Sequence, residues 1–228
     1  MVKLISNLYE KLHILQNIYI KNNFFKKKES YSMDKEDLVI QEYFKNRTYG
    51  FYVDVGCYHP LQRNNTMLLY LKGWRGINID ISDFSIKLFN FLRPEDLNLN
   101  LAISNLEGEI DMFFQKKLSQ LSTIKEKHAK IAFQGTIHNK KILSRRLNSI
   151  LEESKYRGKR INFLNIDVEG SDFEVLQSLD FNKYSPELIC IEVIEKELEK
   201  SDVFNFLYNK KYKKTWSGVF SHIFQLTN

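Results

Sequence analysis

The chain has 228 residues, of which 43% are hydrophobic and 14% aromatic, with 34 Lys and Arg, 28 Asp and Glu, and two cysteines. This composition excludes a disordered chain, and the length favours one domain with a modest extension. No stretch approaches the roughly 20 apolar residues of a membrane span, and charges interrupt the first apolar stretch, so no signal peptide is expected. With two distant cysteines expected as buried free thiols, we predict a cytoplasmic protein.

Residues 1–31 are expected to form an amphipathic helical extension. Apolar residues recur there at spacings of three and four, namely Leu4, Ile5, Leu8, Leu12, Leu15 and Tyr19. Such a helix can dock on the following domain, pair with a second subunit in a homodimer, or lie on a membrane. Because its polar face is not strongly basic, docking or pairing is favoured.

Residues 32–228 are expected to form one α/β domain. After a helix over 34–44, the patterns predict strands at 51–55, 76–80, 97–103, 161–168 and 187–193, helices at 65–72, 86–92 and 173–179, and further β structure at 109–114 and 213–226. Strands that alternate with short helices predict a mostly parallel sheet with helices on both faces.

Four of these strands carry an acid at or near the carboxyl end: Asp54, Asp80, Asp167 and Glu192. Ligands of open α/β sheets bind at that edge. Four carboxylates gathered there indicate a site, because burying unpaired negative charge without a ligand is costly.

The spacing of the first two acids indicates the kind of ligand. Gly56 follows Asp54 in an expected turn, and Asp80 comes 24 residues after Gly56. In nucleotide-binding sheets, an acid at this second position accepts hydrogen bonds from a ribose diol. The turn lacks the further glycines of a pyrophosphate cradle, so an adenosyl ligand without phosphates fits better. S-adenosylmethionine is such a ligand, and carboxylates complement its sulfonium and ammonium groups.

Four stretches resemble the FkbM family of S-adenosylmethionine-dependent methyltransferases, in the family's order and spacing. They are GFYVDVG at 50–56, NNT at 64–66, GWRGINID at 73–80 and NIDVEG at 165–170. The resemblance runs from about residue 32 to the carboxyl end. It implies a Rossmann-like class I methyltransferase fold, with a mostly parallel seven-stranded sheet, over residues 32–228.

The same resemblance implies how the cofactor is held. Asp54 and Gly56 would line the methionine end, Asp80 would hold the ribose, Ala102 and Ile103 would border the adenine, and Cys57 and Ile81 would be neighbouring contacts. One departure concerns the turn after Gly56. Many methyltransferases have a glycine two residues later, where this chain has Tyr58 followed by His59 and Pro60, so the loop is expected to be stiffer.

Asp167 and Glu169 are the expected catalytic acids, and His59 is a further candidate. Strand alternation puts both carboxylates on the same face. Asp167 could act as general base on an acceptor hydroxyl, could bind a divalent metal together with Glu192 or a histidine, or could cap the helix that follows. These three roles stay open at the level of the sequence.

The leading interpretation is O-methylation of a hydroxyl on a sugar, a surface-glycan precursor or a secondary metabolite. Residues 116–160 carry 13 Lys and Arg against three acids, a net +10. This segment would help to bind a phosphorylated or nucleotide-linked acceptor, or it is a solvated basic surface. Methylation of nucleic acid is less favoured, because the fourth strand lacks an Asn-Pro-Pro-aromatic motif. A non-catalytic interaction protein is the third interpretation.

Overall fold

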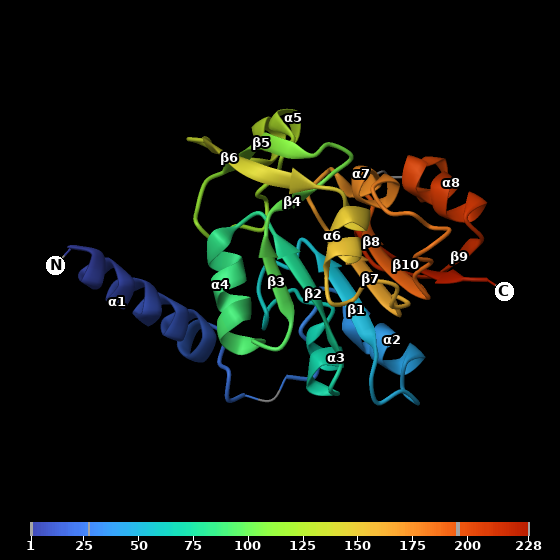
Figure 1. Ribbon diagram of the computed structural model, residues 1–228, viewed down its shortest axis with the longest axis horizontal. Coiled ribbons are helices and arrows are strands. Elements are labelled where there is room, and N and C mark those ends of the chain that lie inside the picture. Colours follow the sequence, from blue (N-terminus) through green and yellow to red (C-terminus); the bar gives the residue numbers. More distant parts are fainter. Residues whose placement is uncertain (1, 27, 195–196, 228) are drawn as a thin grey trace.

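A seven-stranded sheet forms the centre of the molecule (Figure 1). The computed structural model describes residues 2–26, 28–194 and 197–227. The strand order is β3-β2-β1-β7-β8-β10-β9. The strands are β1 (Phe51–Val55), β2 (Arg75–Asp80), β3 (Leu97–Asn100), β7 (Phe163–Ile166), β8 (Leu188–Glu192), β9 (Tyr212–Ser217) and β10 (Ser221–Leu226). All neighbours are parallel except β10, which is antiparallel to both β8 and β9.

Helices cover both faces of this sheet, because alternate strand residues supply apolar side chains to each side. On one face, Val53 and Val55 share a core with α6 (Leu147–Glu153), α7 (Asp172–Gln177) and α8 (Asp202–Asn209). On the other, Tyr52 packs with α2 (Glu36–Tyr43) and α3 (Met67–Leu71). Helix α4 (Asp83–Leu92) lies against β2 and β3. The predicted Rossmann-like α/β sheet with helices on both faces is confirmed.

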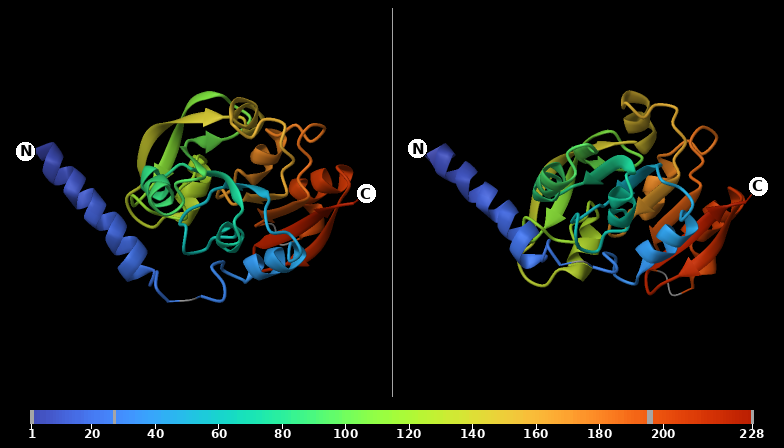
Figure 2. Two further views of the ribbon diagram at one scale, coloured as in Figure 1. Left: turned by 60° about the horizontal axis from the view of Figure 1, so that its bottom comes forward. Right: turned by 90° about the horizontal axis from the view of Figure 1, so that it is seen from below.

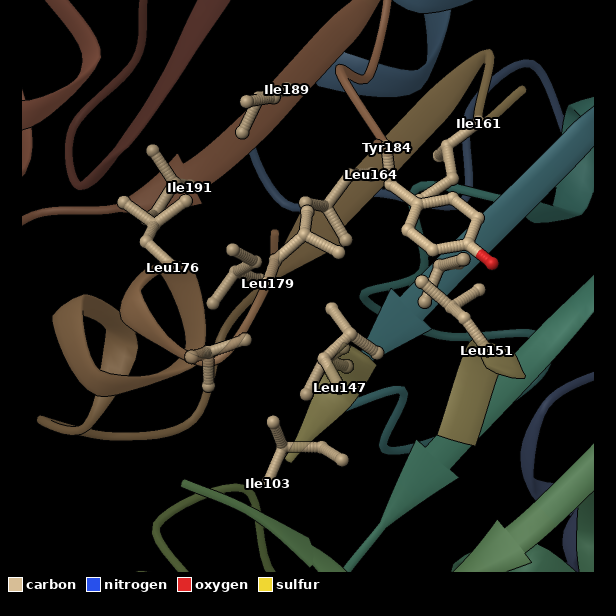
Figure 3. Packing of buried hydrophobic residues seen from close by; sticks show 14 of the residues in the cluster. Ile103, Leu147, Leu151, Ile161, Leu164, Leu176, Leu179, Tyr184, Ile189 and Ile191 are labelled. Atoms are coloured by element: carbon tan, nitrogen blue, oxygen red, sulfur yellow. The ribbon is translucent and has the colours of Figure 1, made fainter. Parts of the chain in front are cut away.

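The hydrophobic core on the side of α6, α7 and α8 holds in place the strands whose ends form the site. Figure 3 shows Leu164 of β7 and Ile189 and Ile191 of β8 packed against Leu176 and Leu147 from the covering helices. All five side chains are fully buried. Burying an aliphatic side chain of this size contributes about 1.5–3 kcal/mol, so the carboxyl ends of these parallel strands stand on a rigid base.

A second, three-stranded sheet lies between β3 and β7 in the chain. It consists of β4 (Ala102–Ile103), β6 (His138–Arg145) and β5 (Gly108–Phe114), in that order, and α5 (Glu126–Ala132) connects β5 to β6. The single strand expected over 97–103 is therefore wrong. The chain leaves the main sheet after Asn100, and Ala102 and Ile103 pair with Ser144 and Arg145 of β6.

The amino-terminal segment forms α1 (Val2–Leu15) and continues as a π-helical stretch, η1 (Gln16–Lys21). Ile18 is fully buried in a cluster with Leu61 and Met67, while the ring of His13 stacks on Phe84 of α4. The rest of α1 extends beyond the body of the molecule (Figure 2). Within the described residues, no helix combines the length and the apolar character that crossing a membrane requires. The division into residues 1–31 and 32–228 stays a prediction.

Candidate active site

A cavity of about 370 Å³ opens at the carboxyl ends of the central strands. The strand ends contribute Gly56, Asp80, Asp167 and Glu192 to its lining. Ligand pockets of α/β sheets form at this edge because every parallel strand of the sheet ends there. The register of the sheet brings these residues together, since Val55 pairs with both Ile79 and Ile166, and Ile166 pairs with Ile191.

Gly56 makes the turn at the end of β1, and no other residue fits there. Its φ is +80°, in the left-handed region. A Cβ atom at this position would overlap the backbone carbonyl of Asp167. The amides of Gly56 and Cys57 both donate to the Ile79 carbonyl, at 2.9 and 3.1 Å. The turn is thus held between the ends of β2 and β7, and its backbone borders the cavity.

Asp80 closes the end of β2 with its carboxylate directed at the following loop. One oxygen accepts from the Tyr58 amide at 2.8 Å and the other from the Ser82 amide at 2.7 Å. Burial raises the pKa of Asp80 to about 6, although the two amide hydrogen bonds oppose that rise. The carboxylate lines the cavity with unused acceptor capacity, as a hydrogen bond from a ligand hydroxyl would require.

Asp167 and Glu192 form an acidic pair at the ends of β7 and β8. Burial raises the pKa of Glu192 to about 8, with Asp172 and Glu169 adding to the effect. Burial and the nearby Glu192 also raise the pKa of Asp167 well above its usual range. The Oε2 atom of Glu192 is buried without a hydrogen-bond partner. A buried acceptor left unpaired in this way is ready for a donor from a ligand.

Glu169 stands beside this pair on a strained turn. Its φ is +55°, and Tyr58 and Arg63 of the cavity lining also have positive φ, at 49° each. Backbone strain of this kind in non-glycine residues clusters at functional sites. The Glu169 carboxylate lies 3.3 Å from the His128 ring, and burial together with Asp172 raises its pKa to about 7.

Comparison with known proteins agrees with this geometry. The family model described as the methyltransferase FkbM domain matches residues 54–214, which is more than half of the chain. The chain belongs to the FkbM methyltransferase family.

A curated relative, Methyltransferase 1 of Beauveria bassiana (strain ARSEF 2860), is 29% identical over 90 residues. That match covers 39% of this chain and only 36% of the fungal protein. No solved structure matches the chain. Both named findings are methyltransferases, and the seven-stranded sheet is the fold expected of the family.

Asp54 of this FkbM domain lies beneath the cavity and not in its lining. It is fully buried, and its oxygens accept from Asn165 at 2.9 Å, Thr66 at 2.8 Å and Asn64 at 3.2 Å. Arg93, also fully buried, binds Thr66 and Asn64 at 2.8 and 2.7 Å. Asp54 therefore holds the NNT stretch against the strand ends, and its direct contact with a cofactor stays a prediction.

Cys57 and His59 are also absent from the lining. Cys57 is buried against Ile86 and Phe89 of α4. The ring of His59 is fully buried, with Nδ1 accepting from the Leu61 amide at 3.0 Å and Nε2 lying 3.2 Å from the Asn22 amide nitrogen. Burial lowers the pKa of His59 to about 3. Both ring nitrogens are engaged, so the geometry gives His59 a structural position between η1 and the loop.

The remaining expected cofactor contacts do line the cavity. Ile81, Ala102 and Ile103 lie on its β2 and β4 side, together with Ile79 and Leu101. This apolar wall suits a flat ring system, and it is separated from the acidic pair by the width of β1. The lining therefore runs from an apolar end, past Asp80, to a carboxylate-rich end.

The possible metal site lacks the ligands that it needs. Among residues 2–26, 28–194 and 197–227, no group of three or more His, Cys, Asp or Glu side chains is placed to hold a metal ion. Asp167 and Glu192 alone would offer two carboxylates. The divalent metal that the sequence left open as a possibility does not fit this arrangement.

Several lining residues were not predicted from the sequence. Arg63 and Asn65 come from the loop after β1, Glu36 from α2, and Ser119 and Gln120 from the loop between β5 and α5. The NNT stretch at 64–66 was part of the family resemblance, but the sequence did not indicate that this loop lines the cavity. Across the described chain, none of the Lys and Arg side chains of residues 116–160 lines the cavity, although uncharged residues of that segment do.

Proposed function

We propose that the cavity binds S-adenosylmethionine and that the protein transfers the methyl group to a hydroxyl of a small molecule. The observation that carries the proposal is the change in polarity along the cavity lining. It runs from the apolar wall of Ile81, Ala102 and Ile103, past Asp80, to the carboxyl groups of Asp167 and Glu192. An adenine, a ribose diol and a sulfonium with an ammonium group match that order. Burial raises the pKa of Glu192 to about 8, so the bound cation would favour ionisation of this acidic pair.

In this proposal each part of the lining has a separate task. Asp80 accepts hydrogen bonds from the ribose, and the Gly56 backbone allows the methionine portion to lie close to the sheet. Arg63, the one cation that lines the cavity among the described residues, is suited to the ligand's carboxylate. The bound cofactor supplies an electrophilic methyl group for direct displacement.

The acceptor lies at the carboxylate-rich end. An acceptor hydroxyl must lose its proton, and Glu169, with a pKa of about 7, is suited to receive it. The Asp167–Glu192 pair positions the hydroxyl by hydrogen bonding. We propose a sugar, a surface-glycan precursor or another polyhydroxylated metabolite without a phosphate. Acids outnumber the single Arg63 in the lining, and the basic segment 116–160 directs no cation into the cavity.

Isothermal titration with S-adenosylmethionine and S-adenosylhomocysteine tests the cofactor. We expect binding by the native chain and a loss of at least about tenfold in affinity for Asp80→Asn, because one good hydrogen bond to a charged group contributes about 1.5–3 kcal/mol. Asp111→Asn is the matched control, since Asp111 lies on β5 and pairs with Lys141 outside the cavity lining. Absence of binding by the native chain would refute the proposal.

Transfer of a labelled methyl group separates the alternatives. The panel contains neutral sugars, their phosphorylated forms, and RNA. Label in neutral sugars supports the proposal, and label confined to RNA would establish the nucleic-acid alternative. Cofactor binding without transfer to any pool would favour a non-catalytic role. The buried free thiols of Cys57 and Cys190 fit a reducing compartment, and a cytoplasmic location stays a prediction.

A further inference from the structure

Helix α1 carries an apolar stripe that faces solvent. Ile5, Leu8, Leu12 and Leu15 follow one another at spacings of three, four and three, so they share one side of the helix. Their exposed fractions are 61%, 59%, 56% and 39%. A helix on a protein surface usually turns its apolar side to the core. Here that side is uncovered, which indicates that another surface covers it.

The opposite side of α1 makes the contacts with the body. Glu10 forms an ion pair with Lys87, and His13 stacks on Phe84, so both anchor the helix to α4. These positions lie across the helix from Leu8 and Leu12. The docking contacts therefore hold the apolar stripe outward, and Figure 2 shows α1 reaching beyond the body, where a large surface can approach it.

Basic and aromatic side chains accompany the stripe. Residues 1–28 contain six lysines and a single acid, Glu10, which is already paired with Lys87. Lys11, Lys21 and Lys26 are exposed. Phe25 is 84% exposed. A cationic segment with uncovered aliphatic and aromatic side chains is complementary to an anionic lipid surface, where lysines meet headgroups and aromatic rings lie at the interface.

A second copy of the chain is the competing occupant of the stripe. The stripe spaces its residues as a coiled coil does, but it spans only 11 residues, fewer than two heptads, whereas a pattern kept over at least three or four heptads indicates a coiled coil. Two copies would also bring like-charged lysines together. The polar face of α1 alone is weakly basic, which disfavoured a membrane in the sequence, but the exposed Lys21 and Lys26 that follow α1 make the whole segment cationic. Charge and length together therefore favour the lipid surface.

We propose that residues 2–26 bind the surface of an anionic phospholipid membrane, with α1 lying in the interface plane and its docked side holding the domain against the bilayer. The segment lies on the membrane and does not span it. The proposal is independent of the methyl acceptor and of the cofactor.

Co-sedimentation of the full chain with vesicles tests this proposal. Phosphatidylcholine vesicles are compared with vesicles of phosphatidylcholine and phosphatidylserine. We expect binding to the mixed vesicles that weakens as salt is raised, and weak binding to phosphatidylcholine alone. Leu8→Ser combined with Leu12→Ser should reduce binding by about tenfold or more, because each change removes an inserted aliphatic side chain.

A matched control replaces two leucines of similar exposure elsewhere. Leu71 and Leu106 are 60% and 67% exposed, and Leu71→Ser with Leu106→Ser should leave vesicle binding unchanged. Lys21→Gln with Lys26→Gln should weaken binding and reduce its salt dependence, without altering any buried side chain.

Three results would overturn the proposal. They are absence of binding to anionic vesicles by the native chain, equal binding by the Leu8 and Leu12 variant, and a dimer in light scattering that the same variant dissociates. The last result would assign the stripe to a second copy of this chain. Circular dichroism of each variant confirms that the fold is kept.

Discussion

Glu169 is the carboxylate of the cavity whose ionisation is best matched to neutral pH. Burial and the neighbouring Asp172 raise its pKa to about 7, whereas Asp80 has a pKa of about 6 and Glu192 a pKa of about 8. A general base is most effective when its pKa lies near the working pH. Its φ of 55° is unfavourable for a residue other than glycine, so the surrounding fold holds the Glu169 backbone in a strained conformation.

Glu169→Gln is expected to lower the rate of methyl transfer by about 10²–10⁴-fold, because the amide cannot accept the proton. The rate of the native chain should rise with pH through about 7 and then level off, and the variant should lose that dependence. The measurement is a pH–rate profile with saturating cofactor on the best acceptor of the panel.

Glu174→Gln is the control for this change, since Glu174 lies on α7 and pairs with Lys125 outside the cavity lining. It should keep the native profile. A Glu169→Gln variant with an unchanged profile would assign the proton transfer to the Asp167–Glu192 pair.

At the scale of single elements, the turn after β1 determines how closely β1 and β7 can end. The space beside Gly56 is filled by the Asp167 backbone carbonyl, and the φ of +80° excludes most other residues. The loop that follows is held by the buried hydrogen bonds that Asn64 and Thr66 donate to Asp54. Turn and loop together form the floor of the cavity.

Gly56→Ala should destabilise the protein by at least about 3 kcal/mol, since the methyl group overlaps backbone that cannot move without separating the strands. Gly158→Ala is the matched control. Gly158 also has a positive φ, of +70°, but its Cβ would meet no atom within 4 Å, so a loss of only about 1 kcal/mol is expected. Urea denaturation measures the free energy of unfolding of both variants. Equal losses of stability would mean that the backbone around Gly56 shifts to accommodate the methyl group, against this prediction.

The sequence allowed the central strands to be predicted well, because each is a short apolar run between turn residues. It also placed Asp80, Asp167 and Glu192 at one edge, since the ends of parallel strands meet there. Asp54 was expected at the same edge but does not line the cavity, because it lies two residues before Gly56 in the turn. Alternation puts it on the same side as Tyr52, among the buried polar groups of the loop.

The second sheet could not be predicted in the same way. β6 carries Lys140 and Lys141 and is mostly exposed, so it lacks the apolar alternation by which a strand is recognised. The run over 97–103 looks continuous, and nothing local in it shows that the chain changes sheets after Asn100. Pairing with a distant strand decides that change, and periodicity carries no information about the partner.

For the whole molecule, the gathered acids make stability depend on pH. The folded pKa of Glu192 is about 8, above the ordinary value of 4.5. Between those two pH values the unfolded chain ionises this group more readily than the folded chain does. Stability should therefore be greatest below about pH 4.5 for this group and should fall as pH rises toward 8.

Glu192→Gln should raise the stability at pH 8 by on the order of 1 kcal/mol, or about 2–4 °C in Tm, and should change little near pH 4. The estimate is well below the full effect of the pKa shift, because the side chain is partly open to the cavity and water screens it. Calorimetry at both pH values measures the difference. Glu199→Gln, an exposed change, should show no such pH dependence, and an equal gain at both pH values would contradict the explanation.

The loop between β5 and α5 has a consequence for how such a protein diversifies. Five of its residues form one wall of the cavity: Ser119, Gln120, Leu121, Ser122 and Ile124. They belong to the insertion that builds the second sheet, while Gly56 and Asp80 belong to the first two strand ends. This wall can therefore vary without changing the strand ends that carry Gly56 and Asp80, although Ala102 and Ile103 of the same insertion border the proposed adenine site. If the proposed function holds, substitutions in the loop would change which acceptor fits while Gly56 and Asp80 stay unchanged.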